Sequence, residues 1–140
     1  MGTELGAKSV NKAIGDQMTT FSRATPVLRS FDEAKAKEFY IDFLGFQVDF
    51  EYRFGENFPL YMGISKDDCQ LHITEHYGAA NPGGAVRIAI EGIREYQQAL
   101  LDKQYKFARP GLDQKPWGVI EMTITDPFGN RITFAEESGE

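Results

Sequence analysis

The sequence predicts an α+β domain made of two tandem βαβββ modules, whose curved sheets surround a cleft while the helices lie on the outer face. Each half of the chain has a strand-like segment, then a segment of helical period, then three more strand-like segments. The halves match at nearly constant offsets: Asp32 corresponds to Gly92 at 60 residues, and Leu71-His72-Ile73 to Ile132-Thr133-Phe134 at 61. Because few residues are identical between the halves, the repeat is one of pattern.

The domain is expected over residues 24–138, with modules at about 24–77 and 84–137, and with residues 1–23 as an N-terminal arm or short helix. A chain of 140 residues with 41% hydrophobic content suits one domain with a real core. The net charge of −6 disfavours nucleic acid as a partner. No stretch approaches the roughly 20 apolar residues of a membrane span.

A basic run followed by an apolar segment, which would mark a secretory signal, is absent from the start of the sequence. Cys69 is the single cysteine, which excludes an intrachain disulfide and a zinc-ribbon site. We therefore expect a cytoplasmic protein.

The first module begins with a strand at 25–29. Ser30 and Glu33 match a capping box, which predicts that Ser30 caps a helix continuing to Leu44, where Gly45 supplies a left-handed stop. Further strands are predicted at 46–52, 60–64 and 70–74, the last two joined by a turn at Asp67 and Asp68.

The second module repeats this order after a Gly- and Pro-containing break. A strand at 85–90 precedes a helix from Ile93 to about Lys103, and strands are predicted at Phe107, 119–125 and 131–134. Residues 126–130, Asp-Pro-Phe-Gly-Asn, are typical of a tight turn.

Alternation along the strands predicts two faces. The apolar set, expected to pack under the helices, is Leu28, Leu71, Ile73, Val86, Ile88, Ile90, Ile120, Met122, Ile124, Ile132 and Phe134. The opposite set is Thr25, Val27, Arg29, His72, Thr74, Ala85, Arg87, Ala89, Glu121, Thr123, Arg131 and Thr133. Such a mixed face is either exposed to water or forms a polar-lined cleft with its twin. Aromatic residues near the strand ends favour the cleft: Phe50, Tyr52, Phe54, Phe58, Tyr61 and Trp117.

Five short stretches carry a family resemblance: Pro26 to Arg29, Lys37 to Tyr40 leading into Leu44-Gly45-Phe46, Asp49-Phe50, Pro116-Trp117-Gly118, and Asp126 to Asn130. On these the sequence, from about residue 25 to residue 137, resembles the vicinal-oxygen-chelate superfamily. That superfamily includes glyoxalases, extradiol dioxygenases, thiol-transferring antibiotic-resistance enzymes and bleomycin-binding proteins. The resemblance implies paired βαβββ modules around a cleft, usually in a dimer.

Enzymes of this superfamily hold a divalent metal at four strand positions, which by alignment are Thr25, His72, Ala85 and Thr133 here. Only His72 is a plausible metal ligand, so we expect neither a metal nor another cofactor, and we assign no catalytic residue. The alternative is a divergent metal-dependent glyoxalase, dioxygenase or thiol-transferase-like enzyme that uses His72 with an unorthodox carboxylate, since Glu75, His76 and Glu121 lie nearby.

Apart from the metal positions, the sequence resembles the bleomycin-resistance branch of the superfamily, whose dimers sequester a flat, cationic glycopeptide without a metal. The implied function is antibiotic binding, and hence resistance, in the cleft of a homodimer, with a small molecule rather than nucleic acid or membrane as the partner. The expected ligand-binding residues are Arg29, Asp49, Phe50, Tyr61, His72, Arg87, Trp117, Gly118 and Glu121. Aromatic rings stack on planar groups and cations, and Gly118 permits close backbone approach.

The sequence does not decide whether the ligand is cationic or anionic. Asp49, Glu51 and Glu121 would attract a cation. Arg29, Arg87 and Arg131 would repel it unless they are paired or turned outward, and they would otherwise select an anionic ligand. A structural or regulatory dimer with a vestigial cleft is the third alternative.

Overall fold

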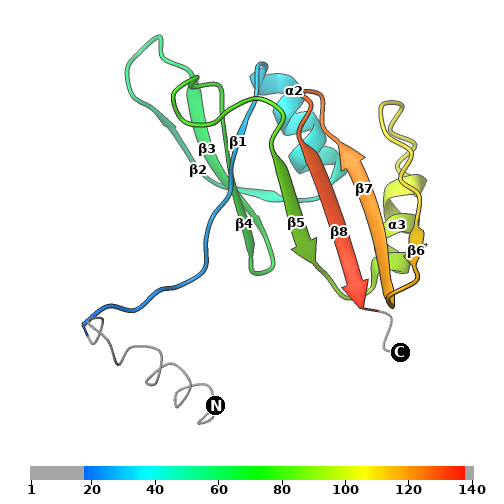
Figure 1. The fold of residues 1–140 in the computed structure, drawn as a ribbon. Helices are drawn as coiled ribbons and strands as arrows, with labels where there is room; N and C mark the ends of the chain where they lie inside the picture. The colour runs from blue at the N-terminus through cyan, green and yellow to red at the C-terminus, as the bar shows by residue number, and fades with distance from the viewer. Residues whose placement is uncertain (1–17, 138–140) are drawn as a thin grey trace.

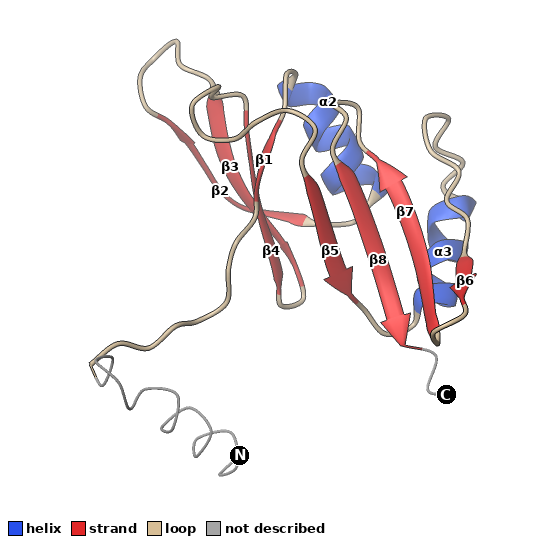
Figure 2. Cartoon of the chain, in the orientation of Figure 1, coloured by secondary structure: helices blue, strands red, loops and turns tan. Residues whose placement is uncertain are grey.

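In a computed structural model of the chain, residues 18–137 are described, and they form two four-stranded mixed sheets with two helical segments (Figures 1 and 2). Most of the predicted N-terminal arm lies outside the described residues. The α+β fold with two βαβββ units is confirmed, and the sheets are curled without closing into a barrel. No helix within the described part of the chain is long and apolar enough to cross a membrane.

The first sheet contains β1 (Val27–Arg29), β2 (Gln47–Arg53), β3 (Leu60–Lys66) and β4 (Cys69–Thr74), in the order β1-β4-β3-β2. The second contains β5 (Ala85–Ala89), β6 (Asp113–Lys115), β7 (Val119–Thr125) and β8 (Arg131–Glu137), in the order β5-β8-β7-β6. In each sheet the first strand pairs in parallel with the last, and the other pairs are antiparallel. This shared order is the repeat that the sequence predicts.

The first helix begins later than predicted and changes type along its length, whereas it ends as predicted at Leu44, with Gly45 at a φ of +88°. It comprises α2 (Glu33–Lys37) followed by a π-helical segment, η1 (Glu38–Phe43). Asp32, not Ser30, is the N-cap, and its side chain accepts a hydrogen bond from the Lys35 N–H. The Ser30 N–H instead donates to Thr74 O, which extends the pairing of β1 with β4 and delays the helix by two residues.

The second helix, α3 (Ile93–Asp102), agrees with its prediction, but the strand expected at Phe107 is wrong. The strand that follows α3 is instead β6, whose sequence Asp-Gln-Lys has no apolar alternation. As an edge strand it needs no buried side chain, and so it has no hydrophobic signal.

The apolar faces of both sheets contribute to one core together with the helices. Within the predicted apolar set, Val86 and Ile90 are partly buried and the rest are buried. Figure 1 shows α3 lying behind the β5–β8 sheet. A buried polar network ties the modules together: Asp126 Oδ2 accepts hydrogen bonds from Tyr40 Oη at 2.6 Å and Asn130 Nδ2 at 2.8 Å. Asn130 Nδ2 also donates to Arg29 O, so the Asp-Pro-Phe-Gly-Asn turn anchors the first module as well as ending a strand.

Candidate functional site

A row of residues crosses the polar face of the first sheet. Phe50 pairs with Gly63, Gly63 with His72, and His72 with Val27. The Phe50 ring lies directly over Gly63, since a Cβ added there would be 2.2 Å from Phe50 Cε2. The absent side chain therefore lets the ring reach across β3 and contact the His72 imidazole edge-on, at a centroid distance of 5.3 Å.

We call Phe50, Tyr52, Phe54, Tyr61 and His72 the aromatic face. The Phe50 and Tyr61 rings are nearly parallel, with centroids 6.3 Å apart, and Tyr61 Oη is 2.8 Å from His72 Nδ1. Phe54 contacts both tyrosine rings edge-on. Phe50, Tyr52 and Phe54 remain 43%, 54% and 58% exposed, so the rings form an open apolar surface fixed from beneath.

A register shift between Val48 and Phe50 in β2 decides which charges reach this face. Asp49, in the bulge, accepts a hydrogen bond from Ser65 Oγ at 3.0 Å, which places both Asp49 and Phe50 on the polar side. Glu51 emerges on the opposite side and pairs with Lys37 of α2 at 2.8 Å. The expectation that Glu51 joins Asp49 in attracting a ligand is therefore wrong.

Arg29 lies at the other edge of the first sheet and is held in place. Its Nε donates to Glu75 O at 3.1 Å, and its guanidinium carbon lies 4.7 Å from the centroid of the Phe31 ring.

The polar face of the second sheet carries a different chemistry. Arg87 Nη1 and Glu121 Oε2 form an ion pair at 2.9 Å, and the Thr123 and Thr133 hydroxyls are 3.0 Å apart. Arg131 is exposed on the same face. Within the described residues, no hydrogen bond, ion pair or ring contact joins the Arg87–Glu121 pair to the aromatic face.

Trp117 and Gly118 lie in the turn between β6 and β7, at the edge of the second sheet. Trp117 is 68% exposed, with Lys115 Nζ 5.9 Å from its ring centroid, and Gly118 has a φ of +86°. The nine predicted ligand-binding residues thus occur as three groups, of which the one on the first sheet is the largest.

The family positions do not fit a metal. Of Thr25, His72, Ala85 and Thr133, only His72 carries a ligating nitrogen, and one such ligand is fewer than the three or more protein ligands of a catalytic metal site. Among residues 18–137 no group of three or more His, Cys, Asp or Glu side chains is arranged to hold an ion.

The site residue that the sequence analysis missed is Gly63. Its signal was available, because a lone glycine inside an apolar strand often marks a close approach of another group.

Comparisons with known proteins agree with this architecture. The family model described as "Glyoxalase superfamily protein" matches residues 9–140. No curated protein sequence matches the chain.

Three solved structures show the same fold. One is a bleomycin-binding protein complexed with bleomycin, 20% identical, with 83% of this chain and 98% of that chain covered and a TM-score of 0.63. A glyoxalase/bleomycin resistance protein/dioxygenase superfamily member from Sphaerobacter thermophilus is 22% identical, with coverages of 86% and 99% and a TM-score of 0.64. A bleomycin resistance determinant encoded on the transposon Tn5 is 18% identical, with coverages of 84% and 98% and a TM-score of 0.64.

Proposed function

Because the chain belongs to the glyoxalase superfamily, we propose that it is a metal-independent binding protein that captures a planar aromatic compound on its aromatic face. The observation that carries this proposal is the cluster of Phe50, Tyr61 and His72, in which the exposed Phe50 ring lies over Gly63 and packs beside the half-buried Tyr61 and His72 rings. Such rings offer stacking surface that costs little conformational entropy on binding, because the sheet already fixes them. Bleomycin, the ligand named for one structural neighbour, is the first compound to test.

The local charges favour a cationic ligand. Asp49 accepts hydrogen bonds from Ser65 and Gln47, both neutral, and among the described residues no ion pair neutralises its negative charge. Arg87 is paired with Glu121, and Arg29 is turned onto Phe31 and Glu75 O. A cation stacked on Phe50 would therefore meet one carboxylate at the bulge of β2, opposed on the second sheet by Arg131, which has no ion pair among the described residues.

A second copy of the chain completes the cleft in this proposal. The aromatic face projects from one sheet and the Arg87–Glu121 face from the other, and within residues 18–137 no hydrogen bond, ion pair or ring contact joins the two. Two copies related by a two-fold axis would lay the first sheet of each against the second sheet of the other, giving two equivalent clefts. Each cleft would then combine stacking rings with a polar wall.

Calorimetric titration of the chelator-treated protein with metal-free bleomycin tests this function. We expect submicromolar binding near one ligand per chain, weakened at least tenfold by Phe50→Ala because about half of the stacking surface is lost. Phe107→Ala is the matched control, since Phe107 is 62% exposed outside the aromatic face. Absence of binding would remove bleomycin as the ligand. Stoichiometric metal in purified protein, with activity lost in His72→Ala, would replace the proposal with the enzyme alternative.

A further inference from the structure

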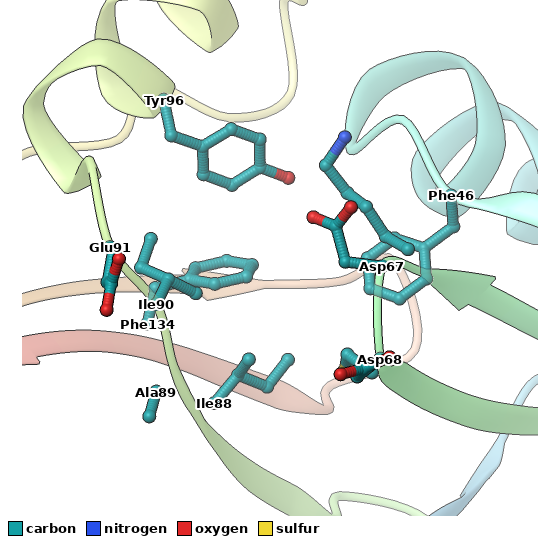
Figure 3. Close-up of a pocket in the computed structure, with 11 residues that line it drawn as sticks. Phe46, Asp67, Asp68, Ile88, Ala89, Ile90, Glu91, Tyr96 and Phe134 are labelled. Atoms are coloured by element: carbon teal, nitrogen blue, oxygen red, sulfur yellow. The ribbon is translucent and has the colours of Figure 1, made fainter.

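A second cavity lies between the two modules, outside the aromatic face. It measures about 730 Å³ and is bounded by the β3–β4 hairpin on one side and by the end of β5 and α3 on the other (Figure 3). None of the nine residues predicted to bind a ligand lines it. Its volume lies within the usual range for cavities that bind small molecules.

Apolar side chains form the floor of this cavity. Phe46, Ile88 and Phe134 are buried beneath it, and Tyr96 forms one wall. The Tyr96 ring is fixed at both ends, because its hydroxyl donates to Leu44 O at 2.6 Å and its edge contacts Phe134 at a centroid distance of 5.3 Å. The cavity therefore presents a rigid apolar surface rather than one that must be ordered by a ligand.

Carboxylates surround the rim. Asp67 and Asp68 form the two-residue turn between the paired Lys66 and Cys69, and Glu91 follows β5 on the opposite side. In Figure 3 the Asp67 carboxylate and the Tyr96 hydroxyl point toward one another across the cavity. Within residues 18–137 none of the three carboxylates takes part in an ion pair.

Among the described residues two cations lie at this rim: Arg23, whose Nη1 donates to Asp68 O at 2.6 Å, and Lys66. The Lys66 Nζ lies 5.8 Å from the Tyr96 ring centroid, which shows that the ring face accepts a positive charge. The carboxylates of Asp67, Asp68 and Glu91 against these two cations leave one negative charge in excess around an apolar floor.

We propose that this inter-module cavity binds a hydrophobic cation, a protonated amine carried on an aromatic or aliphatic body. The body would cover Ile88 and Phe134, and the ammonium would lie at the rim beside Asp67 and Asp68, with Glu91 across the cavity. An anionic ligand is disfavoured by the same carboxylates, and a neutral one would leave them uncompensated.

An amide NMR titration of the isotope-labelled full chain with 1-naphthylmethylamine at neutral pH tests the site. We expect saturable shifts at residues 66–69 and 88–91, and binding at least fivefold tighter than that of 1-naphthalenemethanol, the neutral isostere. The double variant Asp67→Asn/Asp68→Asn should weaken the amine about fivefold, because two exposed carboxylates are removed.

The matched control is Asp42→Asn/Asp102→Asn, which removes the same charge from exposed positions outside the cavity lining. Binding in this control should be unchanged. Equal binding of amine and alcohol, equal weakening in both double variants, or shifts confined to the aromatic face would each overturn the proposal.

Discussion

Gly63 is the residue on which the shape of the aromatic face depends. Replacing it with Ala would put a Cβ 2.2 Å from Phe50 Cε2, and the ring must then leave its place against His72. Because Phe50 is 43% exposed, its ring can turn toward solvent when the added methyl group displaces it, and Ala also suits a strand better than Gly, so we expect the free energy of unfolding to change by less than about 1 kcal/mol. Ring-current shifts of the His72 protons should fall, and affinity for an aromatic ligand should fall with them.

The double variant Gly63→Ala/Phe50→Ala separates the two effects. It keeps the new methyl group and removes the ring, so it should match Phe50→Ala in its His72 shifts and in ligand binding. Unchanged His72 shifts in Gly63→Ala alone would contradict the proposed role of Gly63.

Gln104 is the opposite case to Gly63, because a residue with a side chain occupies a backbone conformation that favours glycine. It follows the C-cap of α3 with a φ of +53°, and its N–H donates to Leu101 O at 3.0 Å. Gln104→Gly should raise the free energy of unfolding by about 0.5–1 kcal/mol, since glycine adopts this conformation without steric cost. Gln98→Gly, at an exposed position inside α3, should lower it by about 1 kcal/mol. Urea denaturation of both variants measures the difference, and a loss of stability in Gln104→Gly would refute the argument.

At the scale of elements, charges link α2 to β2. Glu33 pairs with Arg53 at 2.8 Å, and Lys37 pairs with Glu51 at 2.8 Å and with Glu33 at 3.5 Å. The hydrogen bond from Arg53 is the main cause that lowers the pKa of Glu33 below 4.5. Because the lowered pKa belongs to the folded state, this contribution to stability is present above pH 4.5 and is lost as the pH falls through the folded-state pKa.

Glu33→Gln should therefore flatten the decline of stability below pH 4.5 while slightly lowering stability at neutral pH. Urea denaturation at a series of pH values measures both effects. Glu56→Gln is the control, since Glu56 is exposed and takes part in no ion pair among the described residues. Parallel pH profiles for wild type and Glu33→Gln would exclude the proposed coupling.

Element types were largely predictable from the sequence because burial imposes a period. Strands whose one face packs on the core alternate visibly, as in β7, and the helical period of α3 marks its buried side. β6 escaped prediction because an edge strand of polar residues has no period to detect. The π-helical turn of η1 escaped because it buries Phe39, Tyr40 and Phe43, the positions that an α-helix of the same sequence would bury.

The candidate site was less predictable because it depends on register. Strict alternation puts Asp49 and Phe50 on opposite faces, and only the bulge in β2 brings them together while sending Glu51 toward Lys37. Residue types alone therefore located the strand that carries the site but not which of its charges face the ligand.

At the scale of the whole molecule, the open question is what covers the aromatic face. Exposed rings this close together are unfavourable in water, and a second copy of the chain is the occupant that the proposed cleft requires. We therefore expect the ligand-free protein to be a dimer, with a sedimentation mass of about two chains.

Phe54→Glu should raise the dissociation constant of the dimer at least tenfold, because it places an unpaired charge in the interface. Phe107→Glu introduces the same charge at a similarly exposed phenylalanine (62% against 58%) away from the aromatic face and should leave the dimer intact. Sedimentation velocity distinguishes the two variants, and a monomeric wild type would mean that each chain binds its ligand on one open sheet rather than in a shared cleft.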